Sequence, residues 1–231
     1  MLRCEKLQLR YDDFSLAAEL GFAAGRITAL IGPSGAGKST FLAAIAGFLV
    51  PAKGRVIWAA QDISALSPAE RPISILFQDN NLFPHLTITQ NVGLGLRSGL
   101  RLTADQRAQV AAVLDSVGLA GMGARKPAAL SGGQQSRAAL ARVLLADRPL
   151  VLLDEPFAAL GPRLKDEMLD LVQQRLADQG RTVIMVTHDP ADAKRIADAV
   201  AVVADGTVAA PVATRALFEN PPPALARYLG K

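Results

Sequence analysis

The stretch from Gly32 to Thr40 carries the residues best suited to bind phosphate groups. It matches the pattern G-x-x-x-x-G-K-[ST] between an apolar strand and a helix, which is the setting that such a loop needs. Its glycines let backbone N–H groups turn toward phosphate oxygens, and the helix N-terminus adds a favourable dipole. Lys38 supplies charge to the β- and γ-phosphates, and the Ser39 hydroxyl is placed to hold Mg²⁺. We therefore predict that a nucleotide binds along Gly32, Pro33, Ser34, Gly35, Ala36, Gly37, Lys38, Ser39 and Thr40.

Two adjacent carboxylates follow an apolar run over 150–153. Asp154 ends this predicted strand, where it can complete the shell of a Mg²⁺ ion that is bound to phosphates. Glu155 comes one residue later, where it is placed to polarise a water molecule in line with the γ-phosphate. A kinase site excludes activated water, so the glutamate favours hydrolysis over transfer to another acceptor. The pair predicts Mg²⁺-dependent chemistry at the same site as the phosphate loop.

A second segment suited to anions reads Leu-Ser-Gly-Gly-Gln over 130–134, ahead of a helix expected over 135–146. Ser131 is a natural N-cap, and Gly132 and Gly133 expose backbone donors. The chain therefore carries two phosphate-seeking segments that are far apart in sequence. The spacing alone does not say whether the second segment acts on the nucleotide of its own chain or of another.

The elements that must position these residues alternate between short apolar strands and helices. Two early strands, over 7–10 and 14–20, flank a turn at Asp12-Asp13, and further strands are expected over 26–31, 54–58, 73–77, 150–153, 182–186 and 199–204. Helices are expected over 39–48, 104–117, 163–178 and 190–197, with two short ones around the prolines at 221–223. Strands that alternate with helices predict a mostly parallel sheet. The Ala-, Leu-, Gln- and Arg-rich stretch over 87–146 predicts a helical insert.

Composition narrows the class of protein. The chain has 231 residues, half of them hydrophobic, and a formal net charge of +4, so it is long enough to fold around a core of its own. The mild positive charge selects neither nucleotide, nucleic acid nor membrane. Cys4 is the single cysteine, which rules out an internal disulfide and a disulfide-stapled secreted fold. We expect no signal peptide and no membrane span, since no run of about 18 apolar residues occurs. The high share of hydrophobic residues therefore indicates a sheet buried on both faces, a surface that docks onto another protein, or both.

With these motifs the chain resembles the ATP-binding-cassette (ABC) ATPases over essentially its whole length, because Leu-Ser-Gly-Gly-Gln is that family's signature. The resemblance implies one α/β domain with a P-loop NTPase (RecA-like) core and mostly parallel sheet over 1–86 and 147–231. It also implies an N-terminal antiparallel β subdomain and an inserted α-helical subdomain over 87–146. ATP and Mg²⁺ are the implied cofactors, and a head-to-tail homodimer is the implied assembly. In such a dimer, one subunit caps the γ-phosphate on the partner's phosphate loop with Ser131, Gly132, Gly133 and Gln134.

Three single residues match further positions of the family. Tyr11 corresponds to an aromatic residue that stacks on adenine, although a lone tyrosine at a strand end also fits core packing. Gln78 corresponds to a glutamine that contacts Mg²⁺ and water and couples the core to the helical insert. His188 corresponds to a histidine that reaches the γ-phosphate. The resemblance gives His85, the other histidine, no catalytic role.

The chain departs from the family pattern after the acidic pair, where residues 158–161 read Ala-Ala-Leu-Gly. The family usually has aspartate at the position of Gly161, in a loop that crosses the dimer interface. We therefore expect a functional ATPase with altered coupling between its two subunits. A second departure is Gln135, where the family often has a basic residue. Arg137 and Arg142 keep this helix basic.

The loop that begins at Gln78 resembles that of the ATP-binding subunits of bacterial thiamine importers. The likeness rests on Gln-Asp-Asn-Asn-Leu-Phe over 78–83, on Asn-Val-Gly-Leu-Gly-Leu over 91–96, and on an end at 231 where many related importer ATPases carry a further β-domain. It implies transmembrane permease subunits, a periplasmic substrate-binding protein that acts through them, and a peripheral position on the cytoplasmic face of the inner membrane. Leu82, Phe83 and Leu86 are either exposed contacts for a permease helix or internal packing of the insert.

Other functions are excluded or stay open on the sequence. A DNA-repair or chromosome-structure ATPase needs a long coiled coil between the two anion-binding segments. No sustained heptads occur there, and no Lys/Arg-rich aromatic patch points to nucleic acid as a partner. A GTPase should show Asn-Lys-x-Asp, which is absent. An importer of ferric iron, sulfate or polyamines, and an exporter, stay open because their ATPase motors are nearly the same.

Overall fold

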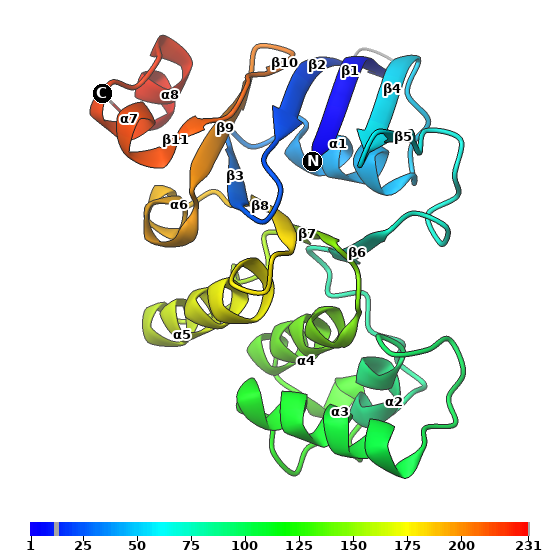
Figure 1. Ribbon diagram of the computed structural model, residues 1–231. Helices are drawn as coiled ribbons and strands as arrows, with labels where there is room; N and C mark the ends of the chain where they lie inside the picture. Colours follow the sequence, from blue (N-terminus) through cyan, green and yellow to red (C-terminus); the bar gives the residue numbers. More distant parts are fainter. Residues whose placement is uncertain (12–13, 231) are drawn as a thin grey trace.

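The computed structural model describes residues 1–11 and 14–230, so the turn expected at Asp12-Asp13 and the final Lys231 lie outside the described residues. Its strands are β1 (Leu2–Tyr11), β2 (Phe14–Phe22), β3 (Ile27–Ile31), β4 (Lys53–Trp58), β5 (Gln61–Asp62), β6 (Ile73–Leu76), β7 (Leu150–Asp154), β8 (Thr182–Val186), β9 (Ala199–Ala204), β10 (Thr207–Val208) and β11 (Val212–Ala213). Its helices are α1 (Lys38–Ala46), α2 (Ile88–Gly93), α3 (Ala104–Ser116), α4 (Gly132–Leu145), α5 (Pro162–Val172), α6 (Pro190–Ile196), α7 (Thr214–Glu219) and α8 (Pro223–Tyr228). Figure 1 shows their arrangement.

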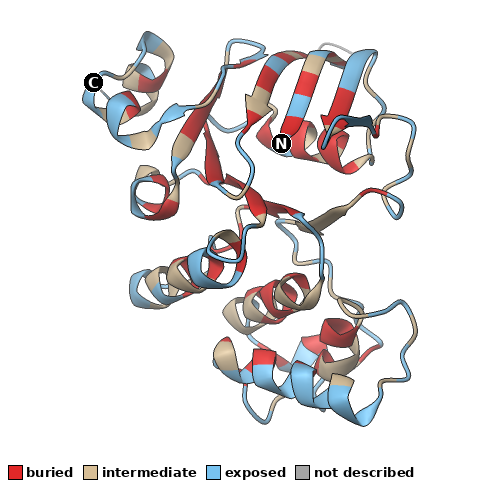
Figure 2. Cartoon of the chain, in the orientation of Figure 1, coloured by how far each residue is buried: buried red, intermediate tan, exposed pale blue. Residues whose placement is uncertain are grey.

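One sheet runs through the molecule in the order β5-β4-β1-β2-β10-β9-β3-β8-β7-β6, with β11 paired to β9. Strands β9, β3, β8, β7 and β6 are parallel, whereas β1 pairs antiparallel with β2 and β4. Every residue of β3, β7 and β8 is buried, because elements cover both faces of the parallel part (Figure 2). The predicted parallel core and N-terminal antiparallel strands are therefore confirmed.

Helices α2, α3 and α4 lie together on one side of the parallel strands (Figure 1). Thr87 and Thr103 begin α2 and α3 with capping boxes, in which the threonine side chain and a glutamine three residues later satisfy each other's backbone N–H groups. Val110 of α3 packs in one apolar cluster with Val151 of β7, which joins these helices to the sheet. The predicted helical character of this stretch is confirmed, while its division from the core at 87 and 146 stays a prediction.

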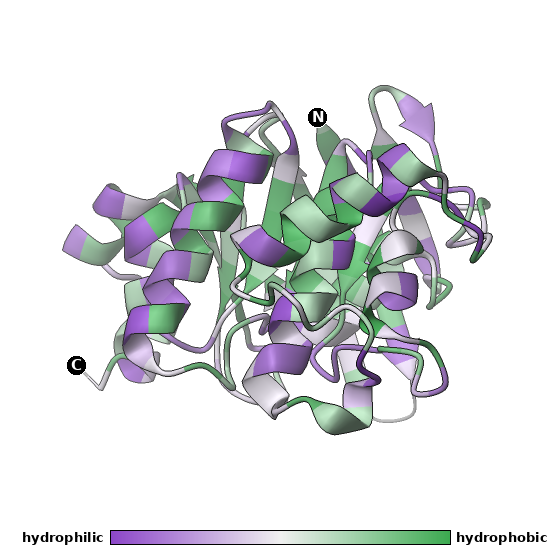
Figure 3. Ribbon diagram, turned by 90° about the horizontal axis from the view of Figure 1, so that it is seen from below, coloured by the Kyte–Doolittle hydropathy of each residue, from purple (hydrophilic) through white to green (hydrophobic). Residues whose placement is uncertain are grey.

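The hydropathy of the helices follows from this packing. In Figure 3 the helices carry hydrophilic residues on their outer sides, and the strands behind them are mainly hydrophobic. Within residues 1–11 and 14–230, no helix combines the length and the apolar character that a membrane crossing requires.

Helix α4 begins at Gly132 rather than at 135, and two helices end two or more residues before the expected position. Helix α1 stops at Ala46 rather than at 48, because Gly47 takes a left-handed φ of 89° and its N–H returns to the carbonyls of Ala43 and Ala44. Helix α5 stops at Val172, and the chain continues to Ala177 as a π-helical turn instead of a regular helix.

The C-terminal end of α1 is held by a buried arginine. Arg71 is only 2% exposed, and its guanidinium donates to the carbonyl oxygens of Ala44 at 3.0 Å and Ile45 at 2.6 Å. It also donates to Leu66 O at 3.1 Å and Ser64 O at 2.9 Å. A cation at a helix C-terminus complements the partial negative charge there. Arg71 therefore fastens the helix of the phosphate loop to the segment that precedes β6.

Candidate nucleotide-binding and hydrolysis site

The loops that carry the predicted catalytic residues meet at one edge of the parallel sheet. The strand ends are aligned by the pairings Leu30 with Val186, Val186 with Asp154, and Leu153 with Leu76. The phosphate loop follows β3, His188 follows β8, Asp154 ends β7, and Gln78 follows β6. Ligands bind outside the carboxyl ends of parallel strands, so the fold gathers these residues where a nucleotide is expected.

Glycine is required at two points of the phosphate loop. Gly35 and Gly37 have φ of 77° and 96°, in the left-handed region that side chains disfavour. A Cβ on Gly37 would lie 2.5 Å from the ring of Phe14, so the β2 strand braces the loop from behind. At Gly32 a Cβ would lie 2.0 Å from the carbonyl oxygen of Val203. The loop is thus packed closely against the strands beside it.

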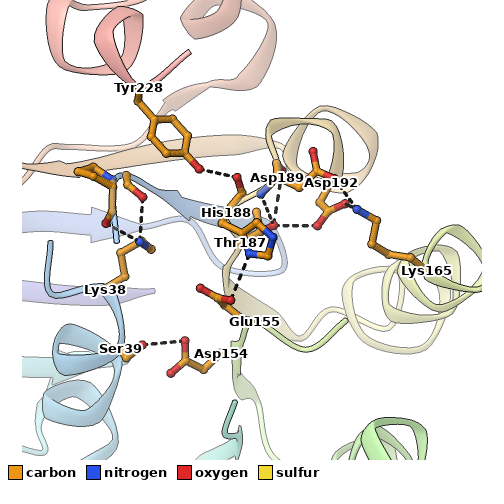
Figure 4. Close-up of polar contacts among 12 residues, drawn as sticks. Lys38, Ser39, Asp154, Glu155, Lys165, Thr187, His188, Asp189, Asp192 and Tyr228 are labelled. Atoms are coloured by element: carbon orange, nitrogen blue, oxygen red, sulfur yellow. Dashed lines mark hydrogen bonds and ion pairs between the residues drawn. The ribbon is translucent and has the colours of Figure 1, made fainter. Parts of the chain in front are cut away.

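Lys38 is turned into the phosphate loop. Its Nζ donates to the carbonyl oxygens of Gly32 at 2.8 Å and Pro33 at 2.9 Å (Figure 4). Burial lowers the pKa of the ammonium group, and Glu155 and Asp154 act in the opposite direction. The lysine side chain therefore lies against the backbone of the phosphate loop.

Ser39 and Asp154 join the phosphate loop to β7. The Ser39 hydroxyl donates to Asp154 Oδ1 at 3.0 Å, and burial raises the pKa of the Asp154 carboxyl. A hydroxyl and a carboxylate are hard oxygen donors that Mg²⁺ accepts, and a Mg²⁺ ion with one or two such ligands takes the rest from phosphate and water. Among the described residues no group of three His, Cys, Asp or Glu side chains gathers to hold a metal. The chemistry of the Ser39–Asp154 pair fits a magnesium ion that arrives with a nucleotide.

Glu155 and His188 lie together, although 33 positions separate them in sequence. Glu155 Oε2 is 3.1 Å from His188 Nδ1, and the Glu155 N–H donates to Val186 O at 3.1 Å. Glu155 has a φ of 44°, an uncommon conformation for a residue with a side chain. This turn directs the carboxylate out of the sheet toward His188 (Figure 4). Such strained residues cluster at active sites.

A second network on the other side of His188 was missed by the sequence reasoning. Lys165 of α5 forms ion pairs with Asp189 and Asp192, and Thr187 Oγ1 donates to Asp192 Oδ2 at 2.7 Å. The hydrogen bond from Lys165 holds the pKa of Asp189 below its usual value. Asp189 also caps α6 ahead of a proline, a pattern that the sequence does contain. The partnership with Lys165 has no such local signal.

The C-terminal helix also reaches this loop. The Tyr228 hydroxyl of α8 donates to the carbonyl oxygen of His188 (Figure 4). Burial raises the pKa of this phenol, and the charges of Asp189 and Glu155 raise it further. His188 is therefore held at its ring by Glu155 and at its backbone by Tyr228, a contact that sequence reasoning also missed.

The signature segment over 130–134 lies at the start of α4, apart from the contacts around His188. Ser131 is the N-cap of α4, with its Oγ accepting from Gln134 N and its N–H donating to Gln134 Oε1. The N-cap prediction is confirmed, and the Gln134 side chain faces back onto Ser131 as the second half of a capping box. Helix α4, which Ser131 caps, lies well away from α1, the helix that follows the phosphate loop (Figure 1).

The start of α4 touches the loop in which the chain departs from the family pattern. A Cβ on Gly133 would lie 3.0 Å from the Leu160 side chain. Gly161 is the N-cap of α5 and gives that helix no side-chain cap. A Cβ on Gly161 would meet nothing within 4 Å, and its φ of −68° suits any residue.

The remaining predicted residues differ in their exposure. Tyr11 is 37% exposed, with its hydroxyl donating to Val50 O at 3.1 Å, so it does not pack in the core. Gln78 is exposed. Of the three apolar residues after it, Leu86 is buried, Leu82 packs partly buried against the core, and Phe83 is 45% exposed. Of the two alternatives, internal packing therefore holds for Leu86 and in part for Leu82, and exposure holds for Phe83.

Comparison with known proteins agrees with this geometry. The family model described as ABC transporter matches residues 17–158. The chain belongs to the ABC transporter family. This cassette is 59% identical, over 100% of both chains, to the thiamine import ATP-binding protein ThiQ of Cereibacter sphaeroides. It is 54% identical, again over 100% of both chains, to the protein of the same name from Ruegeria sp. (strain TM1040).

Solved structures support the same fold. The dimeric structure of MJ0796, a bacterial ABC transporter cassette, matches with a TM-score of 0.83 and 29% identity, over 93% of this chain and 99% of that chain. A dimeric post-hydrolysis state of the same cassette, bound to ADP and Pi, matches with a TM-score of 0.82. The predicted family and the predicted P-loop NTPase fold are thus confirmed.

Proposed function

We propose that this cassette is the ATP-hydrolysing motor subunit of an importer that takes up thiamine or its phosphates through partner permease subunits. The observation that carries the substrate assignment is the similarity over 100% of the chain to two relatives named as thiamine import ATP-binding proteins. The hydrolytic role is supported by the contact between Glu155 and His188 at the edge of the sheet. Import of another small solute, such as ferric iron, sulfate or a polyamine, and export are the alternatives.

In this proposal the nucleotide phosphates lie along residues 32–40. Lys38 exchanges its two carbonyl contacts for oxygens of the β- and γ-phosphates, while Tyr11 stacks on the adenine. Ser39, Asp154 and Gln78 hold Mg²⁺, which neutralises phosphate charge when it is bound. Asp154 is ionised in that state, because a cation favours the carboxylate over its protonated form.

Hydrolysis is assigned to Glu155. Its carboxylate takes a proton from a water molecule as the water oxygen bonds to the γ-phosphorus and the bond to the bridging oxygen breaks. His188 stands against the same carboxylate, so it orients Glu155 and reaches the γ-phosphate from the β8 side. Both groups lie outside the strand ends, where the phosphate loop directs the γ-phosphate.

The second anion site is assigned to a partner subunit in a head-to-tail homodimer. Because α4, the helix that Ser131 caps, lies away from α1 in the same chain (Figure 1), we assign Ser131, Gly132, Gly133 and Gln134 to the nucleotide of the other chain. The two similar solved cassettes described as dimers support this assembly. ATP holds the two subunits together, and hydrolysis lets them part.

The permease is proposed to dock where aromatic side chains stand exposed. Asn91, which is fully buried, accepts from Phe83 N at 2.8 Å and donates to Phe83 O at 3.0 Å. This holds the backbone while the Phe83 ring stays accessible. Phe48 is 51% exposed and packs edge-on against Phe77, with ring centroids 5.3 Å apart. Rigidly held exposed aromatics are typical anchors for a partner helix.

We place the cassette as a peripheral subunit on the cytoplasmic face of the inner membrane, with a periplasmic binding protein delivering substrate to the permease.

Two experiments test the proposal. Glu155→Gln should bind Mg²⁺–ATP without hydrolysing it and elute as a dimer in gel filtration. A variant that stays monomeric at saturating Mg²⁺–ATP would refute the dimer. For the substrate, vesicles that hold the cassette with its permease and binding protein should take up labelled thiamine only when ATP is inside. Uptake of another solute in place of thiamine would overturn the substrate assignment and leave the motor intact.

A further inference from the structure

The loop after Gln78 is fastened by an arginine from the signature helix. Arg142 of α4 donates from Nη1 to Asn81 O at 2.9 Å and from Nη2 to Asn80 O at 3.1 Å. One guanidinium thus binds two successive carbonyls of a loop that lies 61 and 62 positions earlier in the chain. A forked guanidinium suits such paired acceptors because its donors are planar and fixed.

The two residues held in this way have an unusual backbone. Asn80 and Asn81 have φ of 61° and 45°, both in the left-handed region. Asparagine enters this region more readily than other side chains. Each such residue carries some conformational strain, which contacts from its surroundings can offset. The Arg142 side chain supplies such contacts, since both carbonyls point at it.

The same turn carries Gln78. The Asn80 N–H donates to Phe77 O at 3.0 Å, which closes a tight turn around residues 78 and 79. The Gln78 side chain is exposed, so its position depends on the backbone of this turn. Holding the carbonyls of Asn80 and Asn81 therefore restrains the backbone turn from which the Gln78 side chain projects.

We infer that Arg142 is a positioning residue for Gln78, and that it makes the signature helix and the loop after β6 move as one piece. This inference rests on the proposed role of Gln78 in the nucleotide site. Helix α4 is stiff at this point because Leu140, Ala141 and Val143 are buried. A rotation of α4 that moves Ser131 must then pull on the Asn80–Asn81 backbone. Arg142 thus links the helix of the signature segment to the loop that carries Gln78.

The test compares Arg142→Met with Arg142→Lys and with a matched control. Arg181→Met is the control, since Arg181 donates to Ala146 O at 2.7 Å, just beyond the end of α4, and has no contact with the loop after Gln78 among the described residues. We expect Arg142→Met to lower kcat for ATP by about ten- to a hundredfold, the cost of misplacing a catalytic group, with little change in KM. Arg142→Lys keeps the charge but lacks the planar pair of donors that binds both carbonyls. Its kcat should therefore lie between the kcat of Arg142→Met and that of the wild type.

A second readout is local. Amide hydrogen exchange of residues 78–83 should rise in both Arg142 variants and stay unchanged in Arg181→Met. If Arg142→Met does not fold, Arg142→Lys alone decides, and wild-type kcat with wild-type exchange in that variant refutes the inference. A fall in kcat equal to that of Arg181→Met also refutes it. An unaltered chain that does not hydrolyse ATP would instead refute the proposed function.

Discussion

Replacing Arg71 with methionine should destabilise the fold through the helix of the phosphate loop. The guanidinium is buried and donates to four backbone carbonyls, at Ala44, Ile45, Ser64 and Leu66. Hydrogen bonds from a charged donor are worth about 1.5–3 kcal/mol each, which gives about 6–12 kcal/mol for the set. Methionine keeps much of the apolar stem and avoids the cost of burying a cation, which is several kcal/mol. The net loss should be about 3–5 kcal/mol, because the four carbonyl oxygens lose this donor and the saved cost of burying the cation offsets only part of that loss.

For a chain of this length, about 1 kcal/mol shifts Tm by about 2–4 °C, so Arg71→Met should melt about 6–20 °C below the wild type. The assay is thermal and denaturant unfolding of the nucleotide-free protein, followed by circular dichroism. Arg163→Met is the control, because Arg163 is a surface arginine whose side chain is 94% exposed, and it should change stability by less than about 0.5 kcal/mol. A Tm within about 2 °C of the control would refute the view that Arg71 holds α1 in place.

Three further predictions concern the site. Lys38→Ala should lose ATP binding or turnover, since it removes the charge at the phosphate loop; titration with a fluorescent ATP analogue measures this, and wild-type turnover would undo the loop assignment. Gly161→Asp fits without a clash, should add a few tenths of a kcal/mol as an N-cap, and should change the ATPase rate or its cooperativity in ATP; no change in either counts against a role for this loop between subunits. Lys165→Met should make the free energy of unfolding depend less on pH at acid pH, because Asp189 loses its ion pair with Lys165. The lowered pKa of Asp189 contributes stability at pH values above the pKa of this group in the unfolded chain, about 3.9, and that stability is lost as the pH falls through the pKa in the folded chain. Acid unfolding followed by circular dichroism measures this, and equal midpoint pH values for the variant and the wild type would contradict the prediction.

Much of the site was predictable because its residues are read from local patterns. A phosphate loop between strand and helix, a strand that ends in Asp154-Glu155, and a serine before two glycines each carry their chemistry within a few residues. The boundaries of the central strands over 182–186 and 199–204 were predictable for the same reason, since these runs are mainly apolar. The strand expected over 7–10 instead begins at Leu2, and the short strands β5, β10 and β11 were missed.

What the sequence could not give is which distant segments meet. The order β3-β8-β7-β6 places four loops at one edge, and nothing local specifies that order. The contacts of Arg71, Lys165, Tyr228 and Arg142 are likewise long-range hydrogen bonds or ion pairs, formed only once the sheet and helices have packed. The π-helical turn after α5 was missed because its residues are ordinary helix formers, and packing overrides their preference there.

The contact between α8 and the backbone of His188 has a practical consequence for handling this protein. Leu225 is fully buried and Tyr228 bonds to the backbone of His188, so the last described helix borders the proposed hydrolytic centre. A purification tag or a truncation at that end would disturb His188, and the loss would resemble an inactivating mutation. Met1 is 55% exposed at the opposite terminus, which makes that end the better place for a fusion.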